Sequence, residues 1–323
     1  MLDRYGRVIN YLRISVTDRC NLRCCYCMPE GVQDVGMKNI LTFEEIWEVV
    51  RTGVSLVISH IRITDGKPLV RKDCVDLIRG IREISGVETI TMTTNGVLLG
   101  NYGKQLKEAG VDGVNISLDT LDPEEFYKIT GKRELQEVLA GIRAAKTAGL
   151  PVKLNAVNRK ELDPIPLVRY AQEENLPLRF IEMMPVGYGK KYVGRSNEEL
   201  RETLEAVCGK AECMTNREEL SRMGSGPAVY YQFSDLKVPV GFISAIHGKF
   251  CDTCNRVRLT AEGYLKLCLC YDEGEDLRRV LREGEKENLR TIMEQTIFRK
   301  PAAHCFEHPA EMTETHEMVK IGG

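Results

Sequence analysis

The sequence lacks long apolar runs and has no surplus of either charge. Nowhere do about 18 or more apolar residues follow one another, so no transmembrane helix is expected. Lys and Arg number 45 and Asp and Glu 47, a net charge of −2, which argues against a general nucleic-acid binder or a membrane-surface protein. The first twenty residues have neither an apolar stretch nor a small-residue cleavage site, so no secretory signal is expected. We therefore expect a cytoplasmic chain with no nucleic-acid or membrane partner.

What the sequence does contain is core-forming residues and cysteine. Hydrophobic residues make up 43% of the chain, which permits a sizeable core and excludes the disordered class. The 12 cysteines are not expected to form disulfides in a reducing compartment. Six of them fall into two tight groups, which indicates metal binding. The groups are Cys20, Cys24 and Cys27, and Cys251, Cys254 and Cys268.

Predicted strands and helices alternate through the first part of the chain. Thr42 and Glu45 form a capping box at the start of one predicted helix. The alternation predicts right-handed βαβ units and a parallel sheet, and both a doubly wound sheet and a TIM-like barrel fit it. We predict a boundary near residue 186, between residues 1–186 and a smaller mixed region, 187–323. The predicted strands are 11–16, 61–63, 88–93, 113–118, 153–157 and 178–182, and the helices are 43–58, 73–84, 102–109, 123–130, 135–148 and 164–174.

Unusual motifs follow most of these predicted strands. Ligands of parallel α/β folds bind at the carboxyl ends of the strands. The motifs therefore predict one shared pocket. They are the first cysteine group and residues 64–68, 94–96, 118–120 and 183–185.

The first cysteine group has three members within eight residues. A four-iron cluster normally takes four Cys, so three leave one iron open for a reacting small molecule. Structural zinc wants four ligands, and Cys25 adjoins Cys24, which makes it an awkward fourth. Three unrelated loop cysteines are the remaining alternative. We favour an iron–sulfur cluster and expect Cys25 to be a small buried hydrophobe.

The second group leaves iron–sulfur and zinc equally open on spacing alone. Cys270 lies two residues after Cys268, so four zinc ligands are available. The isolated cysteines are expected to be structural. These are Cys74, Cys208, Cys213 and Cys305.

The motifs together resemble a known family. Cys-x3-Cys-x2-Cys after a first strand is similar to the signature of radical S-adenosylmethionine (SAM) enzymes. Residues 251–260, followed by Cys268 and the terminal Gly322 and Gly323, resemble the GTP 3′,8-cyclases of molybdenum cofactor biosynthesis. The resemblance runs from about residue 11 to residue 323. It implies a partial (βα)6 TIM-like barrel with a smaller mixed C-terminal region that carries a second cluster.

The resemblance also implies an activity and its site. The ribose 3′ hydrogen of GTP is abstracted, and C3′ joins guanine C8 to give 3′,8-cyclo-7,8-dihydroguanosine 5′-triphosphate, in the first step of molybdenum cofactor biosynthesis. Two [4Fe–4S] clusters and SAM are the implied cofactors, with a reductant protein or small reductant as partner and a monomer or homodimer as the assembly. The implied cluster ligands are Cys20, Cys24 and Cys27 for the first cluster and Cys251, Cys254 and Cys268 for the second; Tyr26, Gly66, Ser117 and Met184 contact SAM; Arg13, Arg62, Thr93, Lys153, Arg256, Val257 and Arg258 bind GTP; and Arg256, Arg258, Gly322 and Gly323 are catalytic.

The chain departs from that family around its second strand. A loop that normally reads Thr-Gly-Gly-Glu-Pro has Asp65 for a Gly and Lys67 for the Glu. Residues 56–58 read Leu-Val-Ile where a Gly is common, so a helix C-cap is expected to be lost. One alternative is therefore an impaired or non-catalytic homologue that binds both clusters and nucleotide but cleaves SAM poorly. Another is a peptide-modifying radical enzyme, against which the run 255–258 argues, since peptides need no phosphate-binding Arg residues.

Overall fold

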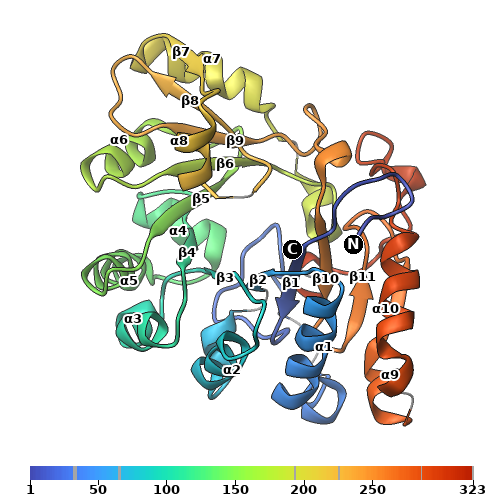
Figure 1. Cartoon of the computed structure of the whole chain (residues 1–323). Coiled ribbons are helices and arrows are strands. Elements are labelled where there is room, and N and C mark those ends of the chain that lie inside the picture. Colours follow the sequence, from blue (N-terminus) through green and yellow to red (C-terminus); the bar gives the residue numbers. More distant parts are fainter. Residues whose placement is uncertain (32–34, 65–66, 193, 225, 285, 322–323) are drawn as a thin grey trace.

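A computed structural model describes residues 1–31, 35–64, 67–192, 194–224, 226–284 and 286–321. These residues form a twelve-stranded sheet in the order β12-β11-β10-β1-β2-β3-β4-β5-β6-β9-β8-β7 (Figure 1). The strands are β1 Tyr11–Ser15, β2 His60–Thr64, β3 Thr89–Thr94, β4 Gly113–Ser117, β5 Val152–Asn158, β6 Leu178–Glu182, β7 Ala211–Cys213, β8 Val229–Phe233, β9 Val240–Ile243, β10 Arg256–Leu259, β11 Tyr264–Lys266 and β12 Gly274–Asp276.

Six parallel strands, β1 to β6, lie side by side in the order in which they occur in the chain. A doubly wound sheet would reverse its strand order partway across, so sequential order selects the barrel type. The sheet has free edges at β12 and β7, which makes the barrel partial. The predicted fold class is confirmed.

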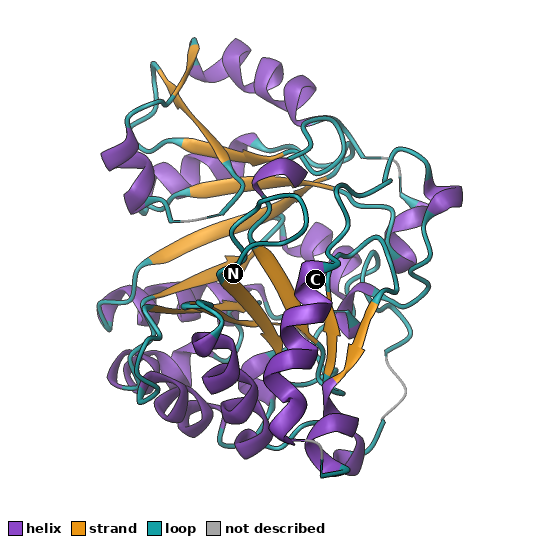
Figure 2. Cartoon of the chain, turned by 45° about the vertical axis from the view of Figure 1, so that its right-hand side comes forward, coloured by secondary structure: helices purple, strands orange, loops and turns teal. Residues whose placement is uncertain are grey.

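Helices cover the outer side of these strands (Figures 1 and 2). The predicted capping box at Thr42 is present: Thr42 Oγ1 accepts from the Glu45 backbone, and the Glu45 carboxylate accepts from the Thr42 backbone. The helices are α1 Phe43–Ser55, α2 Cys74–Arg82, α3 Leu99–Glu108, α4 Pro123–Thr130, α5 Leu135–Thr147, α6 Ile165–Glu173, α7 Asn197–Cys208, α8 Arg217–Arg222, α9 Leu277–Arg282 and α10 Leu289–Phe298.

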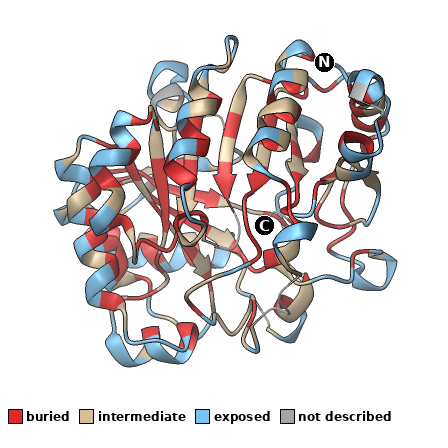
Figure 3. Cartoon of the chain, turned by 90° about the horizontal axis from the view of Figure 1, so that it is seen from below, coloured by how far each residue is buried: buried red, intermediate tan, exposed pale blue. Residues whose placement is uncertain are grey.

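The core lies between these helices and the strands. In β5 the buried residues Val152, Leu154 and Ala156 alternate with Lys153 and Asn155, which are less buried. Because successive side chains of a strand point to opposite faces, the apolar side chains face the helices and the polar ones face the inside of the barrel. Figure 3 shows the same separation at the scale of the whole chain, with buried positions on the strands and the inner faces of the helices.

Helix α1 ends without a glycine, as expected. Leu56 is its C-cap, and the next residue, Val57, has φ 68° and is 65% exposed. A β-branched side chain is strained in this left-handed region, where helices usually place Gly. The expected loss of the C-cap glycine is therefore visible as a strained backbone.

The C-terminal part joins the sheet at both sides. Strand β9 pairs in parallel with β6, and β10 pairs in parallel with β1. The second cysteine group lies just before β10 and just after β11. Because β10 runs parallel to β1 and β11 antiparallel to β10, this group lies at the amino end of β1, whereas the first group follows its carboxyl end. A division of the chain near residue 186 stays a prediction.

No helix in the described residues combines the length and the apolar character that crossing a membrane requires.

Candidate active site

One cavity of about 330 Å³ lies inside the barrel and is lined by both cysteine groups, the first beyond the carboxyl end of β1 and the second near its amino end. The shared pocket predicted from the strand-end motifs is therefore present. Most of the predicted site residues line it: Arg13, Cys20, Cys24, Tyr26, Cys27, Arg62, Thr93, Ser117, Met184, Cys251, Cys254, Arg256, Arg258 and Cys268.

The remaining predicted site residues are Gly66, Gly322, Gly323, Val257 and Lys153. The three glycines fall outside the described residues, as does Asp65, which replaces a Gly of the family's loop. The side chain of Val257 is fully buried in the core.

Lys153 is not among the residues that line the cavity. Its Nζ donates to the backbone carbonyl of Met223 at 2.6 Å. Burial, followed by the nearby positive charges of Arg179 and Arg62, lowers the pKa of Lys153 to about 8. Lys153 is thus close to the cations that line the cavity.

The first cysteine group lies on a turn that two backbone hydrogen bonds hold in place. The Cys27 backbone donates to the Cys24 carbonyl at 2.9 Å, and the Cys25 backbone donates to Ile129 at 2.8 Å. Burial raises the pKa of Cys24, Cys27 and Cys20 add to the rise, and Lys67 opposes it, so the three thiols are close together. The Cys25 thiol instead contacts Arg159 Nη1 at 3.6 Å. Three neighbouring thiols with Cys25 apart fit a three-Cys cluster site.

The second group has a different electrostatic setting. Although burial raises the pKa of Cys254, Lys300, Arg256 and Arg258 lower it to about 7. These cations favour the thiolate form that binds metal.

Cys270 does not itself line the cavity. Its Sγ lies 3.0 Å from Cys305 Sγ in a small buried apolar cluster, against which Cys268 packs. In the described structure Cys270 thus contacts Cys305, whereas the other three cysteines of the four-Cys alternative line the cavity. In addition, no three His, Cys, Asp or Glu residues in the described ranges are placed to hold a single metal ion.

Arginines from three adjacent strands lie next to one another in the sheet. Arg258 pairs in register with Arg13, and Arg13 pairs in register with Arg62. Like charges opposite one another destabilise a sheet, whereas an anion between Arg guanidinium groups is bound by charge-assisted hydrogen bonds. The row therefore indicates an anion site.

Arg179 on β6 is a cavity-lining cation that the sequence reasoning missed. It is 4% exposed, and its guanidinium donates to the side-chain oxygens of Asn155, at 2.8 Å, and Asn115. Burial lowers its pKa. The signal that could have found it is an Arg in the middle of an otherwise buried strand, because such a charge requires a partner.

Acidic residues are few in this cavity. Its described lining contains seven Lys or Arg residues but two acids, Asp119 and Glu182. Asp119 accepts from the Tyr26 hydroxyl at 2.7 Å and from the Val157 backbone at 2.9 Å, and burial raises its pKa. The cavity is therefore suited to a polyanionic ligand.

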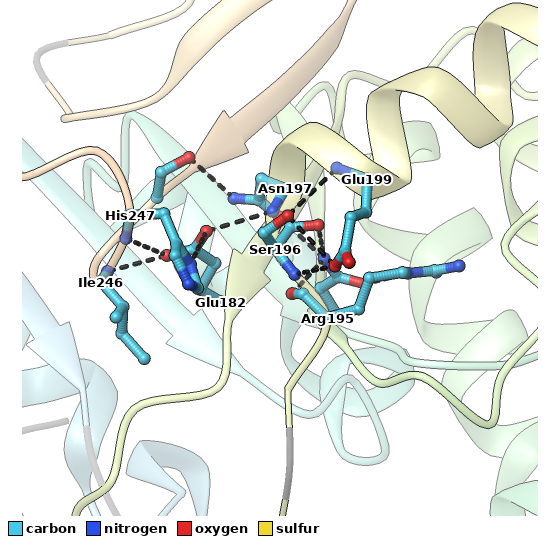
Figure 4. A network of polar contacts seen from close by, with 9 residues as sticks. Glu182, Arg195, Ser196, Asn197, Glu199, Ile246 and His247 are labelled. Carbon is cyan, nitrogen blue, oxygen red and sulfur yellow. Dashed lines mark hydrogen bonds and ion pairs between the residues drawn. The ribbon is translucent and has the colours of Figure 1, made fainter. Parts of the chain in front are cut away.

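Glu182 has a structural role at the end of β6 (Figure 4). Its carboxylate accepts from the backbones of Ile246, His247 and Asn197, at 2.7, 3.1 and 3.1 Å. His247 Nδ1 lies 3.0 Å from the same carboxylate. These contacts tie β6 to the segment after β9 and to the start of α7, and they leave the carboxylate satisfied.

The C-terminal segment reaches the cavity through Met318 and Val319. It is anchored just before them by Glu314, whose buried carboxylate accepts from Lys266 Nζ and, at 2.8 Å, from the backbone of His316. This anchoring holds Met318 and Val319 at the cavity.

Comparisons with known proteins agree with this geometry. Residues 14–164 match the Radical SAM superfamily, and residues 176–306 match the family described as Molybdenum Cofactor Synthesis C. The structure of SuiB from Streptococcus suis bound to S-adenosylmethionine superimposes with a TM-score of 0.65, at 14% identity, over 97% of this chain and 77% of that one. The fold and the site thus define a radical SAM protein.

Full-length relatives narrow the assignment further. The chain is 41% identical over 330 residues to a GTP 3′,8-cyclase of Clostridium perfringens (strain 13 / Type A), covering 100% of both chains. It is 43% identical over 332 residues to one of Thermodesulfovibrio yellowstonii, again covering 100% of both. The chain belongs to the GTP 3′,8-cyclase family.

Proposed function

We propose that this chain is a lyase that cyclises GTP to 3′,8-cyclo-7,8-dihydroguanosine 5′-triphosphate, the first step of molybdenum cofactor biosynthesis. The observation that carries the proposal is a single cavity that holds both three-cysteine groups together with an excess of cations. Two [4Fe–4S] clusters and SAM, when bound, supply the radical chemistry that removes the ribose 3′ hydrogen.

The chain's own residues would hold these cofactors. Cys20, Cys24 and Cys27 would ligate the first cluster, and Cys251, Cys254 and Cys268 the second. Three thiolates leave one iron of each cluster open for a small molecule. Tyr26, Ser117 and Met184, which line the cavity, would contact SAM together with Gly66.

The cations would bind and orient the nucleotide. Arg13, Arg62 and Arg258 present guanidinium groups that bind phosphate oxygens bidentately. Thr93 lines the same cavity and would contact the nucleotide there. The remaining nucleotide contacts would come from Lys153, Arg256 and the backbone of Val257.

Two further parts of the proposal concern the chain end and the partners. The anchored C-terminal segment would bring Gly322 and Gly323 to the cavity, where residues without a Cβ can approach the nucleotide closely. Gly322, Gly323, Arg256 and Arg258 would then act on the bound nucleotide. A reductant protein or a small reductant would supply the electron, and the chain would act as a monomer or homodimer.

Anaerobic incubation of the reconstituted chain with GTP, SAM and a reductant tests the proposal. Both 5′-deoxyadenosine and the cyclised nucleotide should form. Arg258→Ala should weaken GTP binding by roughly ten- to a hundredfold, since losing a charge-assisted hydrogen bond costs on the order of 1.5–3 kcal/mol. Arg51→Ala is the matched control, because Arg51 pairs with Glu48 on the surface. Failure of the chain to form cyclised nucleotide, or unchanged GTP affinity in Arg258→Ala, would contradict the proposal.

A further inference from the structure

Lys300 is a buried cation that lines the cavity together with the second cysteine group and has no role in the proposal above. Its residue is 3% exposed. Within the described ranges, no carboxylate lies at ion-pair distance from its ammonium. Burying a charge is costly unless a partner compensates it, so the surroundings of Lys300 should contain another negative group.

The backbone of Lys300 is held beside the second cysteine group by one guanidinium. Arg7 Nη1 donates to the Cys251 carbonyl at 2.9 Å, and Arg7 Nη2 donates to the Lys300 carbonyl at 3.4 Å. Asp3 pairs with Arg7 at 2.6 Å, so the charge of this guanidinium is already balanced. The position of Lys300 relative to Cys251 is therefore fixed by buried contacts.

The side chain of Lys300 reaches the other members of the second group. Its Nζ donates to the carbonyl of Leu267, the residue before Cys268. Burial lowers the pKa of Lys300, and the thiolates of Cys254 and Cys268 are the largest influences that oppose this fall. In turn, burial raises the pKa of Cys254, and Lys300 is the foremost of the cations that lower it to about 7. The cysteine thiolates are thus the negative partners of this ammonium.

Two arginines near Cys254 are less suited to this role. Arg256 and Arg258 also lower the pKa of Cys254, but both are only partly buried. Water screens part of the charge of a partly buried group, whereas a charge surrounded by protein acts more strongly on its neighbours. Lys300 is therefore the cation with the greatest expected effect on a metal centre held by these thiolates.

We infer that Lys300 is the resident counter-charge of the second iron–sulfur cluster and raises its reduction potential. The inference rests on the proposed function, because it requires that Cys251, Cys254 and Cys268 hold a cluster. Reduction adds one negative charge to a cluster, and a buried ammonium close by stabilises that added charge. Net charge, hydrogen bonds to the sulfurs and solvent exposure set the potentials of such clusters. Lys300 contributes positive charge where little water is present.

A redox titration of the reconstituted holoenzyme, followed by electron paramagnetic resonance, tests this inference. Lys300→Met approximately keeps the bulk of the side chain and removes its charge. The equilibrium constant for reducing the second cluster should fall roughly tenfold, a shift of about 59 mV to more negative potential for one electron. The potential of the first cluster should not change. A Cys251→Ala, Cys254→Ala double variant, which retains only the first group, shows which signal belongs to which cluster.

Further variants separate the charge of Lys300 from its hydrogen bond. Lys300→Arg keeps the positive charge and should keep the potential close to that of the unaltered chain. Lys300→Gln can still donate to the Leu267 carbonyl but is neutral, so it should shift the potential as Lys300→Met does. Lys249→Met is the matched control: Lys249 also acts on Cys251, but it is exposed and pairs with Glu307 at 2.7 Å. It should leave both potentials unchanged.

Unchanged potentials in both neutral variants, or an equal shift of both clusters, would overturn the inference. If the neutral variants lose the second cluster, iron analysis decides the matter. About four irons in Lys300→Met and about eight in Lys300→Arg would support a counter-charge that holds the cluster, whereas the same loss in Lys300→Arg would overturn it. Absence of a second cluster from the unaltered chain would instead overturn the proposed function.

Discussion

Lys67 is the residue at which this chain differs most in charge from the loop that its family resemblance implies. Burial raises the pKa values of both Cys24 and Asp119, and Lys67 lowers both. Its ammonium therefore lies near the first cysteine group and near the cavity's carboxylate. The SAM ammonium and sulfonium, both positive, would bind close to this third positive charge.

We predict that Lys67→Glu binds SAM about tenfold more tightly than the unaltered chain. Two unit charges about 4 Å apart interact by about 4 kcal/mol at an effective dielectric of about 20. That is an upper bound, because Lys can extend its ammonium toward water and Asp119 offsets part of the charge. Titration of SAM into both proteins measures the difference, with the exposed Lys72→Glu as control. Equal affinities would show that the loop backbone contacts SAM and that the charge of Lys67 does not affect SAM binding.

Among the elements, helix α1 carries a local defect that can be corrected. Val57 has a left-handed backbone conformation directly after the helix. Its side chain is mostly exposed and contributes little to the core. Val57→Gly should therefore stabilise the fold by about 1 kcal/mol, since Gly adopts this conformation without strain.

Chemical denaturation measures this change as a shift in the free energy of unfolding. Val207→Gly is the matched control: Val207 is also about half exposed but lies inside α7, where Gly should destabilise by a few tenths of a kcal/mol. A loss of stability in Val57→Gly would mean that the Val57 side chain contributes more than its backbone costs.

At the scale of the whole molecule, two cysteine groups in one cavity predict the metal content. Anaerobically reconstituted protein should hold about eight irons and little zinc, as two four-iron clusters require. A Cys251→Ala, Cys254→Ala double variant should retain about four irons, because the first group is unchanged. Metal analysis of both proteins decides the matter, and about four irons with stoichiometric zinc in the unaltered chain would contradict the second cluster.

The sequence was informative wherever the signal is local. Strands β1 to β6 and the helices between them were predicted closely, because hydrophobic period and caps such as Thr42 act within a few residues. The pairing of β9 with β6 and of β10 with β1 left no comparable local signal. Arg179 was missed for a related reason: it is recognised by what surrounds it in three dimensions, namely its burial and the two asparagine side chains that accept from its guanidinium.

The pairing of β1 with β10 also constrains how the chain is made. Tyr11 leaves the ribosome 245 residues before its partner in the sheet, Arg256. Until then the hydrogen-bonding edge of β1 beside the first cysteine group stays uncovered, and an uncovered strand edge invites pairing with other chains. At roughly 5–20 residues per second this interval lasts on the order of 10–50 s. A chaperone that shields this edge during synthesis should therefore raise the yield of soluble protein, and chains that end before β10 should aggregate.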